Sequence, residues 1–237
     1  MVTRRNFLEA SGAGLLSAIM LPSTASAVTS SQSTTRKRLA VVTTEWRYHS
    51  HAWHMAERFL VGYPIHGEWH KPELDVVSAY VDQFPENDLS RKRSEEFGFP
   101  IYKTVAEALR CGGNELAVDA VLLIGEHGKY ELSEYGQTKY PRYELFKQVT
   151  DVFRKDGRSV PVFNDKHLSW KWDWAKEMYD LSKELNFAFA AGSSLPGTWR
   201  MPSIDMPYGA EVEELMCVAM GGMDSYDFHA LEVIQCM

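Results

Sequence analysis

The sequence lacks the features that mark a disulfide-rich, a zinc-binding or a nucleic-acid-binding protein. Its 237 residues include three cysteines, Cys111, Cys217 and Cys236, which form neither a CxxC pair nor a metal-ligand spacing. That pattern argues against a disulfide framework and a structural zinc site. The formal net charge is -7, and the basic cluster at residues 36–38 stands alone, which argues against a general nucleic-acid binder.

A long apolar run is also missing at the N-terminus. Residues 13–21 are apolar but interrupted by glycine and serine, so they are too short to span a membrane. They follow Arg4 and Arg5 and precede the small-residue site at 25–27, an order that resembles a twin-arginine (Tat) export signal. The resemblance implies a signal peptide at residues 1–27, a Ser/Thr-rich linker at 28–37, the Tat machinery as a partner, and a periplasmic or secreted protein. A disordered tail with chance arginines is the alternative.

The rest of the chain alternates strand and helix patterns, with 45% hydrophobic residues as in ordinary soluble domains. We expect strands at 39–44, 74–81, 119–124, at the start of 159–168 and at 187–190, and helices at 52–60, 85–97, 104–109, 143–154 and 172–185. This alternation predicts an α/β fold, a Rossmann-like doubly wound parallel sheet over residues 38–190. Residues 191–237, rich in proline at first, are expected to begin a second α+β domain.

The stretch at residues 159–168 is the centre of the functional hypothesis. Its apolar run stops abruptly at Asn164, Asp165, Lys166 and His167. Ligands of open α/β sheets bind beyond the carboxyl ends of the strands, so we expect chemistry at this cluster. A loop carrying a solvated lysine is the alternative.

Two further turns carry polar groups at predicted strand ends. Neighbouring strands would bring all three turns together, and imidazoles and carboxylates there could bind a divalent metal, activate water or recognise a sugar-like polyol. The metal alternative is a hydrolase or lyase, and turn and helix-cap roles would explain the same histidines without one. The candidates are His49, His51 and His54 after the first strand and Glu126 and His127 after the 119–124 strand.

Several segments resemble the nucleotide-binding half of the Gfo/Idh/MocA oxidoreductases. They are residues 74–82, the charged helix ending at 95–98, residues 100–109, residues 119–124, and 164–168 at the place of the family's Glu-Lys-Pro motif. The resemblance implies NAD or NADP as cofactor and hydride transfer on a small-molecule carbohydrate or polyol. Lys166 and His229, the latter within the family-like segment 221–232, are the implied catalytic residues. Residues implied at the cofactor are Thr43, Asp82, Glu126, His127 and Asp165.

The chain departs from the family's pattern at the first turn and at the second strand. The turn at residues 45–51 contains no glycine, and its side chains should crowd a dinucleotide. The position expected to hold the adenosine ribose is Tyr80, and Asp82 either substitutes for it or begins a turn. A non-catalytic periplasmic carbohydrate-binding protein is therefore a third hypothesis.

The chain ends within a predicted helix at 230–236, so we expect a truncated second domain. A homo-oligomer is left open.

Overall fold

The structure is a computed structural model that describes residues 36–193, 195 and 198–237. The predicted export signal and nearly all of the predicted linker lie outside the described residues. Among the described residues, no helix is long and apolar enough to cross a membrane.

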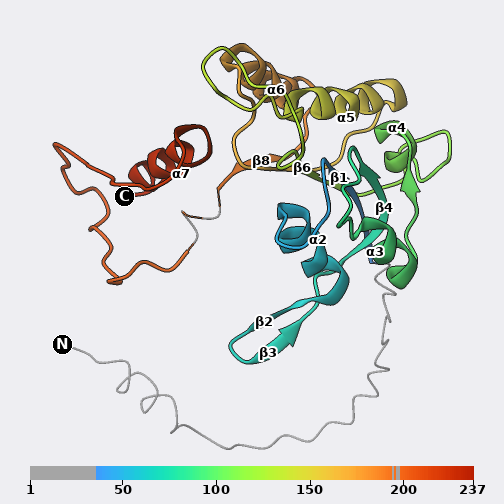
Figure 1. Cartoon of the computed structure of the whole chain (residues 1–237), viewed down its shortest axis with the longest axis horizontal. Helices are drawn as coiled ribbons and strands as arrows, with labels where there is room; N and C mark the ends of the chain where they lie inside the picture. The colour runs from blue at the N-terminus through green and yellow to red at the C-terminus, as the bar shows by residue number, and fades with distance from the viewer. Residues whose placement is uncertain (1–35, 194, 196–197) are drawn as a thin grey trace, which may run out of the picture. The chain divides into compact units, whose positions relative to one another are not determined.

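A six-stranded sheet with the order β5-β4-β1-β6-β7-β8 forms the centre of the fold (Figure 1), and every pair of neighbouring strands is parallel. Numbered along the chain, this is the 3-2-1-4-5-6 order of doubly wound sheets, with its switch point between β1 and β6. The predicted fold class is confirmed. The strands are β1 (Lys37–Thr43), β4 (Leu74–Val81), β5 (Ile101–Tyr102), β6 (Ala120–Ile124), β7 (Val162–Asp165) and β8 (Phe189–Gly192).

Helices cover both faces of the sheet because parallel neighbours need crossover connections. Figure 1 shows α5 and α6 on one side of the sheet and α2 on the other. The helices are α2 (His51–Val61), α3 (Ser90–Phe97), α4 (Val105–Leu109), α5 (Arg142–Asp156), α6 (Trp172–Glu184) and α7 (Met223–Gln235).

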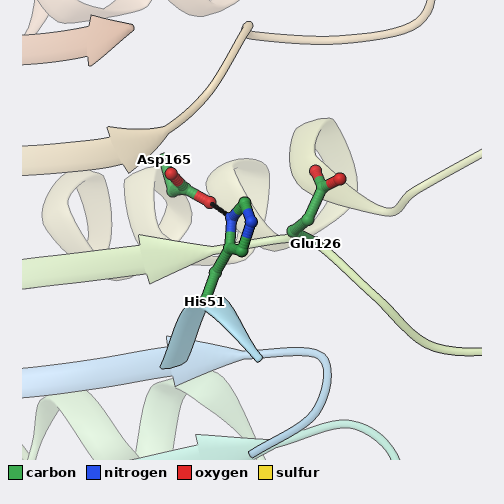
Figure 2. A group of neighbouring side chains, drawn as sticks. All are labelled: His51, Glu126 and Asp165. Atoms are coloured by element: carbon green, nitrogen blue, oxygen red, sulfur yellow. Dashed lines mark hydrogen bonds and ion pairs between the residues drawn. The ribbon is translucent and has the colours of Figure 1, made fainter. Parts of the chain in front are cut away.

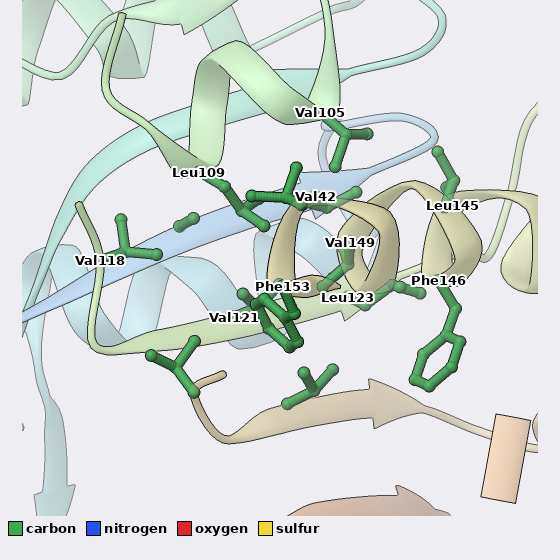
Figure 3. Close-up of a cluster of buried hydrophobic side chains, with 14 of the residues drawn as sticks. Val42, Val105, Leu109, Val118, Val121, Leu123, Leu145, Phe146, Val149 and Phe153 are labelled. Carbon is green, nitrogen blue, oxygen red and sulfur yellow. The ribbon is translucent and has the colours of Figure 1, made fainter. Parts of the chain in front are cut away.

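Two apolar clusters, one on each face, hold these layers together. The larger one joins β1, β6 and β7 to α4, α5 and α6, with Val42, Leu123 and Phe153 at most 1% exposed (Figure 3). The smaller one packs α2 and the first turn against β1 and β4, where Trp46 is fully buried and stacks on Phe99 at 5.9 Å. The sheet is therefore packed on both faces, and the strand ends that carry the polar residues are held rigidly.

Three predicted segments differ from the observed elements. The helix expected from residue 85 begins at Ser90, because Asp88 accepts hydrogen bonds from the Ser90 backbone N–H and hydroxyl and holds a turn ahead of it. The segment at residues 63–70, for which no strand was predicted, forms a hairpin of β2 (Tyr63–Ile65) and β3 (Glu68–His70). The last helix starts seven residues earlier than the predicted 230, at Met223.

Thr104 caps the N-terminus of α4, within the helix predicted at residues 104–109. Its hydroxyl accepts from the Glu107 backbone N–H at 3.1 Å, and the Glu107 carboxylate accepts from the Thr104 N–H at 3.1 Å. This reciprocal capping box satisfies two free amide donors of a helix only one turn long. It explains why α4 starts where the sequence predicts.

Candidate active site

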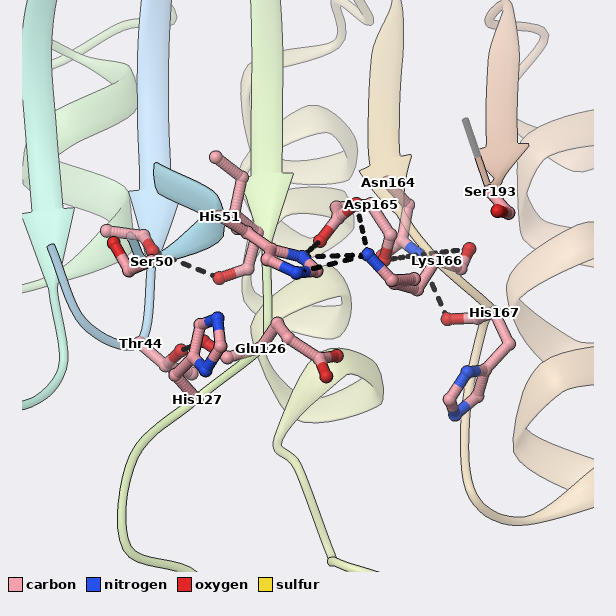
Figure 4. Close-up of polar contacts among 12 residues, drawn as sticks. Thr44, Ser50, His51, Glu126, His127, Asn164, Asp165, Lys166, His167 and Ser193 are labelled. Atoms are coloured by element: carbon pink, nitrogen blue, oxygen red, sulfur yellow. Dashed lines mark hydrogen bonds and ion pairs between the residues drawn. The ribbon is translucent and has the colours of Figure 1, made fainter. Parts of the chain in front are cut away.

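Polar side chains from the β1–α2, β6–α5 and β7–α6 connections meet beyond the carboxyl ends of the strands (Figure 4). The Thr44 hydroxyl, just after β1, donates to the Glu126 carbonyl at 2.5 Å and ties the first two connections together across the switch point. His51 opens α2, and Asp165 and Lys166 end β7. The predicted convergence of these turns is therefore observed for His51, Glu126, Asp165 and Lys166.

Lys166, His51 and Asp165 form a chain of hydrogen-bonding groups. His51 Nδ1 lies 2.5 Å from Asp165 Oδ2, and Lys166 Nζ lies 2.9 Å from His51 Nδ1 and 3.3 Å from His51 Nε2. Nζ therefore lies beside both ring nitrogens and not on the in-plane lone pair of Nε2, and it is also 3.5 Å from Asp165 Oδ1. The arrangement places an amine, an imidazole and a buried carboxylate in mutual contact.

The charge of Asp165 is stabilised by its neighbours. Burial alone would raise the pKa of Asp165, but the hydrogen bond from His51 and the positive charges around it, Lys166 and Arg142 among them, lower that pKa overall. Asp165 is 5% exposed, and Lys166 Nζ is 3.5 Å from its Oδ1. The carboxylate is therefore ionised at neutral pH.

The backbone turns sharply at Lys166 to present its amine. Lys166 has a φ of 70°, in the left-handed region that non-glycine residues rarely adopt. The buried Asn164 side chain supports this turn because its Nδ2 donates to the carbonyls of Asp165 and His167, each at 3.2 Å. A backbone held in a strained conformation by its surroundings is often found at functional positions.

Arg142 is a site residue that the sequence analysis missed. Its guanidinium, 1% exposed, pairs with Glu126 and lies 3.0 Å from His167 Nε2. A Cβ at Gly125 would lie 2.5 Å from Arg142 Cγ, so only glycine at the end of β6 leaves room for this side chain. One feature of the sequence could have pointed to it. An arginine in the first turn of a helix places its charge against the helix dipole, so it needs a negatively charged partner elsewhere.

Two neutral histidines flank these charges. Burial, followed by the charges of His51 and Arg47, lowers the pKa of His127 to about 4. Burial and the charge of Arg142 lower the pKa of His167 to about 4 as well. Both rings are uncharged at neutral pH, and the ring of His127 lies edge-on to that of His51 with ring centroids 4.8 Å apart.

A cavity of about 570 Å³ opens between α2 and the ends of β7 and β8. His51, Asp165 and Lys166 form its polar wall, and Phe163 and Met55 form its apolar wall. This volume suits a small metabolite, and the mixture of apolar surface with a few convergent polar groups is typical of ligand sites.

A divalent metal is poorly suited to this site. One ligand atom each from His51, Glu126 and Asp165 can lie within 4.8 Å of the others (Figure 2). However, Arg142 already pairs with Glu126, and Lys166 lies beside both Asp165 and His51. A divalent ion would have to displace two protein cations, because like charges at such distances repel strongly.

The other histidines of the predicted metal cluster lie elsewhere. His49 is exposed and its ring lies tilted against that of Tyr48, with centroids 4.0 Å apart, and His54 is exposed at the rim of the cavity. Burial and the charge of His51 lower the pKa of His54. The predicted set of His49, His51, His127 and Glu126 therefore does not assemble as one group of ligands among the described residues.

The first turn does not offer the usual dinucleotide grip. Its residues 44–50 include no glycine, Trp46 turns inward to the core, and the Ser50 hydroxyl caps α2 by accepting from the Trp53 N–H at 3.2 Å. The Thr43 hydroxyl, predicted at the cofactor, is buried and lies 3.1 Å from the Ile124 carbonyl oxygen, to which it donates. Its side chain therefore serves the junction of β1 and β6.

The end of β4 is also occupied. The Tyr80 hydroxyl donates to Asp82 Oδ1 at 2.9 Å, and the Tyr130 hydroxyl donates to Asp82 Oδ2 at 2.7 Å. Gln83 exchanges two hydrogen bonds with the Lys129 backbone, so the loop after β6 is fastened over this strand end. Each carboxylate oxygen that would hold a ribose hydroxyl already accepts a hydrogen bond from a tyrosine hydroxyl, which places Asp82 in a loop contact.

His229 reaches the edge of the site through α7. Its Nδ1 lies 2.6 Å from the Ser193 hydroxyl, and the Glu232 carboxylate accepts from the Ser193 N–H at 2.8 Å. Ser193 lines the same cavity as Lys166. Burial and the charge of Lys166 lower the pKa of His229. The two predicted catalytic residues thus lie on the same side of the sheet edge, with Ser193 between their elements.

No family model and no curated protein matches the sequence. Solved structures that are similar to part of the chain are NAD(P)-binding dehydrogenases of the Gfo/Idh/MocA type, at 12–18% identity. Biliverdin reductase from Synechocystis, in complex with biliverdin and NADP+, shares 15% identity with a TM-score of 0.42. A putative dehydrogenase from Bordetella bronchiseptica shares 16% with a TM-score of 0.44. UDP-N-acetylglucosamine 3-dehydrogenase from Acidithiobacillus ferrooxidans shares 12% with a TM-score of 0.40.

These matches cover 66%, 70% and 66% of the chain but only 38%, 35% and 38% of the three proteins. The chain therefore spans less than two fifths of their length. At this sequence identity these proteins are neighbours in fold alone. The doubly wound sheet is assigned from the strand order observed in the chain itself.

Proposed function

We propose that the cavity at the end of β7 is the active site of a Gfo/Idh/MocA-like oxidoreductase that acts on a hydroxyl or carbonyl group of a small sugar or polyol. The observation that carries the proposal is the connected group of Lys166, His51 and Asp165 on the wall of this cavity. A lysine amine backed by an imidazole and a carboxylate is suited to move one proton to or from a substrate oxygen.

The chemistry of these residues follows from their order. In reduction, the Lys166 ammonium donates a hydrogen bond to the substrate carbonyl and then its proton to the oxygen as the hydroxyl forms. The amine regains a proton from water that enters the cavity, and the ionised Asp165, whose Oδ1 is 3.5 Å from Nζ, attracts the positive charge of the ammonium. In oxidation the same groups run in reverse and remove the hydroxyl proton.

The hydride of this reaction would come from NAD(H) or NADP(H), which is the cofactor implied by the resemblance. The chain's residues do not fit that cofactor in the usual manner, because the first turn has no glycine and the Asp82 carboxylate is held by two tyrosines. A nicotinamide dinucleotide would have to be held by other contacts, and no step above is assigned to it.

Titration of the purified full-length protein with NADH and NADPH, followed by nicotinamide fluorescence, tests the proposal. We expect binding in the micromolar range, and coupled oxidation of at least one member of a panel of aldoses and polyols. Lys166→Met should keep cofactor binding but lose turnover by roughly 10²-fold or more, since it removes the proton donor. Ser193→Ala, which alters the same cavity without removing the amine, is the matched control. A folded protein that binds neither nucleotide at millimolar concentration contradicts the proposal.

A non-catalytic carbohydrate-binding protein is the second candidate. It is favoured by the contact of Asp82 with Tyr80 and Tyr130, in which each carboxylate oxygen already accepts a hydrogen bond from within the chain. This candidate predicts saccharide binding in the cavity without nicotinamide binding. Calorimetric titration with the same aldoses and polyols, in the absence of nucleotide, separates it from the oxidoreductase.

We also propose that the protein is exported in the folded state by the Tat machinery to the periplasm or beyond. The support is the order of Arg4 and Arg5, the short apolar segment and the small-residue site at 25–27. Replacement of both arginines by lysine should retain the protein in the cytoplasm. Export of that variant at the normal level would contradict the proposed route.

A further inference from the structure

A second concave surface lies away from the Lys166 cavity, between the loop after β6 and the start of α6. It encloses about 680 Å³ and is lined by Tyr135, Trp170 and Trp172 together with Glu134, Lys139 and Lys171. A neighbouring hollow of about 550 Å³ shares Tyr135 and Trp170 with it. Ser133 and Gln137 complete the lining of the first hollow, and we call its eight lining residues the aromatic cradle.

The rings of the aromatic cradle are unusually open to water for their size. Tyr135 is 81% exposed and Trp172 is 79% exposed, although both line a hollow. Aromatic rings of this size normally bury most of their surface in a core or an interface. A ligand that covers these two rings would gain the apolar contact that the folded chain leaves unused.

The cradle is preorganised. The Ser133 hydroxyl accepts from the Gln137 and Tyr135 backbone N–H groups at 3.1 and 3.2 Å, and this closes the turn that carries Tyr135. Gln137 Nε2 donates to the Trp170 carbonyl at 3.2 Å, and this fastens the turn to the segment before α6. A ligand would therefore not have to order the loop, which removes part of the entropic cost of binding.

The polar groups of the cradle surround the rings. Lys139 Nζ lies 5.9 Å from the centroid of Trp170. Glu134 and Lys171 are exposed residues of the same hollow, and the Lys171 amine lies 5.1 Å from the centroid of Trp174. A pyranose has the matching chemistry, because its C–H faces stack on aromatic rings while its hydroxyls bond to amines and carboxylates at the edge. Charges of both signs around the rings fit a neutral ligand better than a strongly charged one.

We infer that the aromatic cradle is a binding site for neutral saccharides, separate from the Lys166 cavity, that stacks a pyranose on Tyr135 and Trp172. The inference goes beyond the proposed activity and does not depend on it, since a chain without dehydrogenase activity would still bind sugar here.

The test is tryptophan fluorescence and calorimetric titration of the full-length protein with four tetrasaccharides, built from glucose in β-1,4 or α-1,4 linkage, from N-acetylglucosamine, or from mannose. We expect at least one to bind, and Trp172→Ala and Tyr135→Ala each to weaken it by about tenfold or more. Trp199→Ala, which removes another highly exposed tryptophan outside the cradle, should leave binding unchanged. Lys166→Met should also leave it unchanged, which separates this site from the proposed active site.

Two results would overturn the inference. One is that none of the four tetrasaccharides binds at roughly 10 mM, a concentration well above the Kd of weak specific binding. The other is binding that survives both cradle substitutions. Because Tyr135 and Trp172 are largely exposed, their removal should not unfold the chain, and circular dichroism of each variant checks this.

Discussion

Acidification should destabilise this protein through His127 and His167. The pKa of each ring is lowered from 6.5 to about 4 in the folded state, so the unfolded chain binds more protons than the folded chain between these values. Stability is therefore full above pH 6.5 and falls as the pH drops toward 4. A shift of this size corresponds to an upper bound of about 3 kcal/mol for each ring. Because the two rings titrate together, the slope near pH 5 should reach about 2.7 kcal/mol per pH unit.

Urea unfolding at pH 7, 6, 5 and 4.5 measures this slope. His127→Asn removes one titrating ring and suits the backbone, because His127 has a φ of 71° and asparagine tolerates that region. The variant should lose about half of the slope, roughly 1.4 kcal/mol per pH unit. His66→Asn is the matched control, since His66 also has a positive φ, 50°, but lies exposed in the β2–β3 hairpin. An unchanged slope in His127→Asn would refute the reasoning.

Three further predictions concern contacts that hold the site. Arg142→Met should lower the free energy of unfolding in urea by about 3–5 kcal/mol, because it leaves the half-buried Glu126 carboxylate without its partner. Adding Glu126→Gln to this variant should recover part of that loss. Thr104→Ala should cost about 1 kcal/mol through the lost capping box, with an unchanged m-value, and a loss below 0.3 kcal/mol would contradict the capping role. Tyr130→Phe should free one oxygen of Asp82, so the variant should bind a nicotinamide dinucleotide more tightly than the parent protein does. Equal or weaker affinity would show that this contact does not restrict the cofactor.

Much of the fold could be predicted because its signals are local. The apolar run of β6, the Thr104 cap and the spacing of α5 and α6 each depend on residues within a few positions of one another. The strand–helix alternation then leaves few topologies, since crossovers between parallel strands are right-handed. The hairpin of β2 and β3 was missed because its strands are three residues each, too short for a period-2 pattern to stand out.

The candidate site was only partly predictable. Lys166 and Asp165 were identified from the abrupt end of an apolar run, and His51 was one of three histidines that the sequence could not rank. Its selection depends on where α2 begins, because the first helical residue faces the end of β7. Arg142 was missed because nothing near it in the sequence shows that its charge is buried against Glu126.

The sequence by itself determined the order of strands and helices, the strand ends that carry polar groups, and the absence of glycine from the first turn. Only the tertiary structure decided which polar groups pair with one another: Arg142 with Glu126, Lys166 with Asp165 and His51, and the two tyrosine hydroxyls with Asp82. The physical reason is range. Helix and strand signals act over a few residues, whereas a buried ion pair or hydrogen bond depends on which distant groups share a space from which water is excluded.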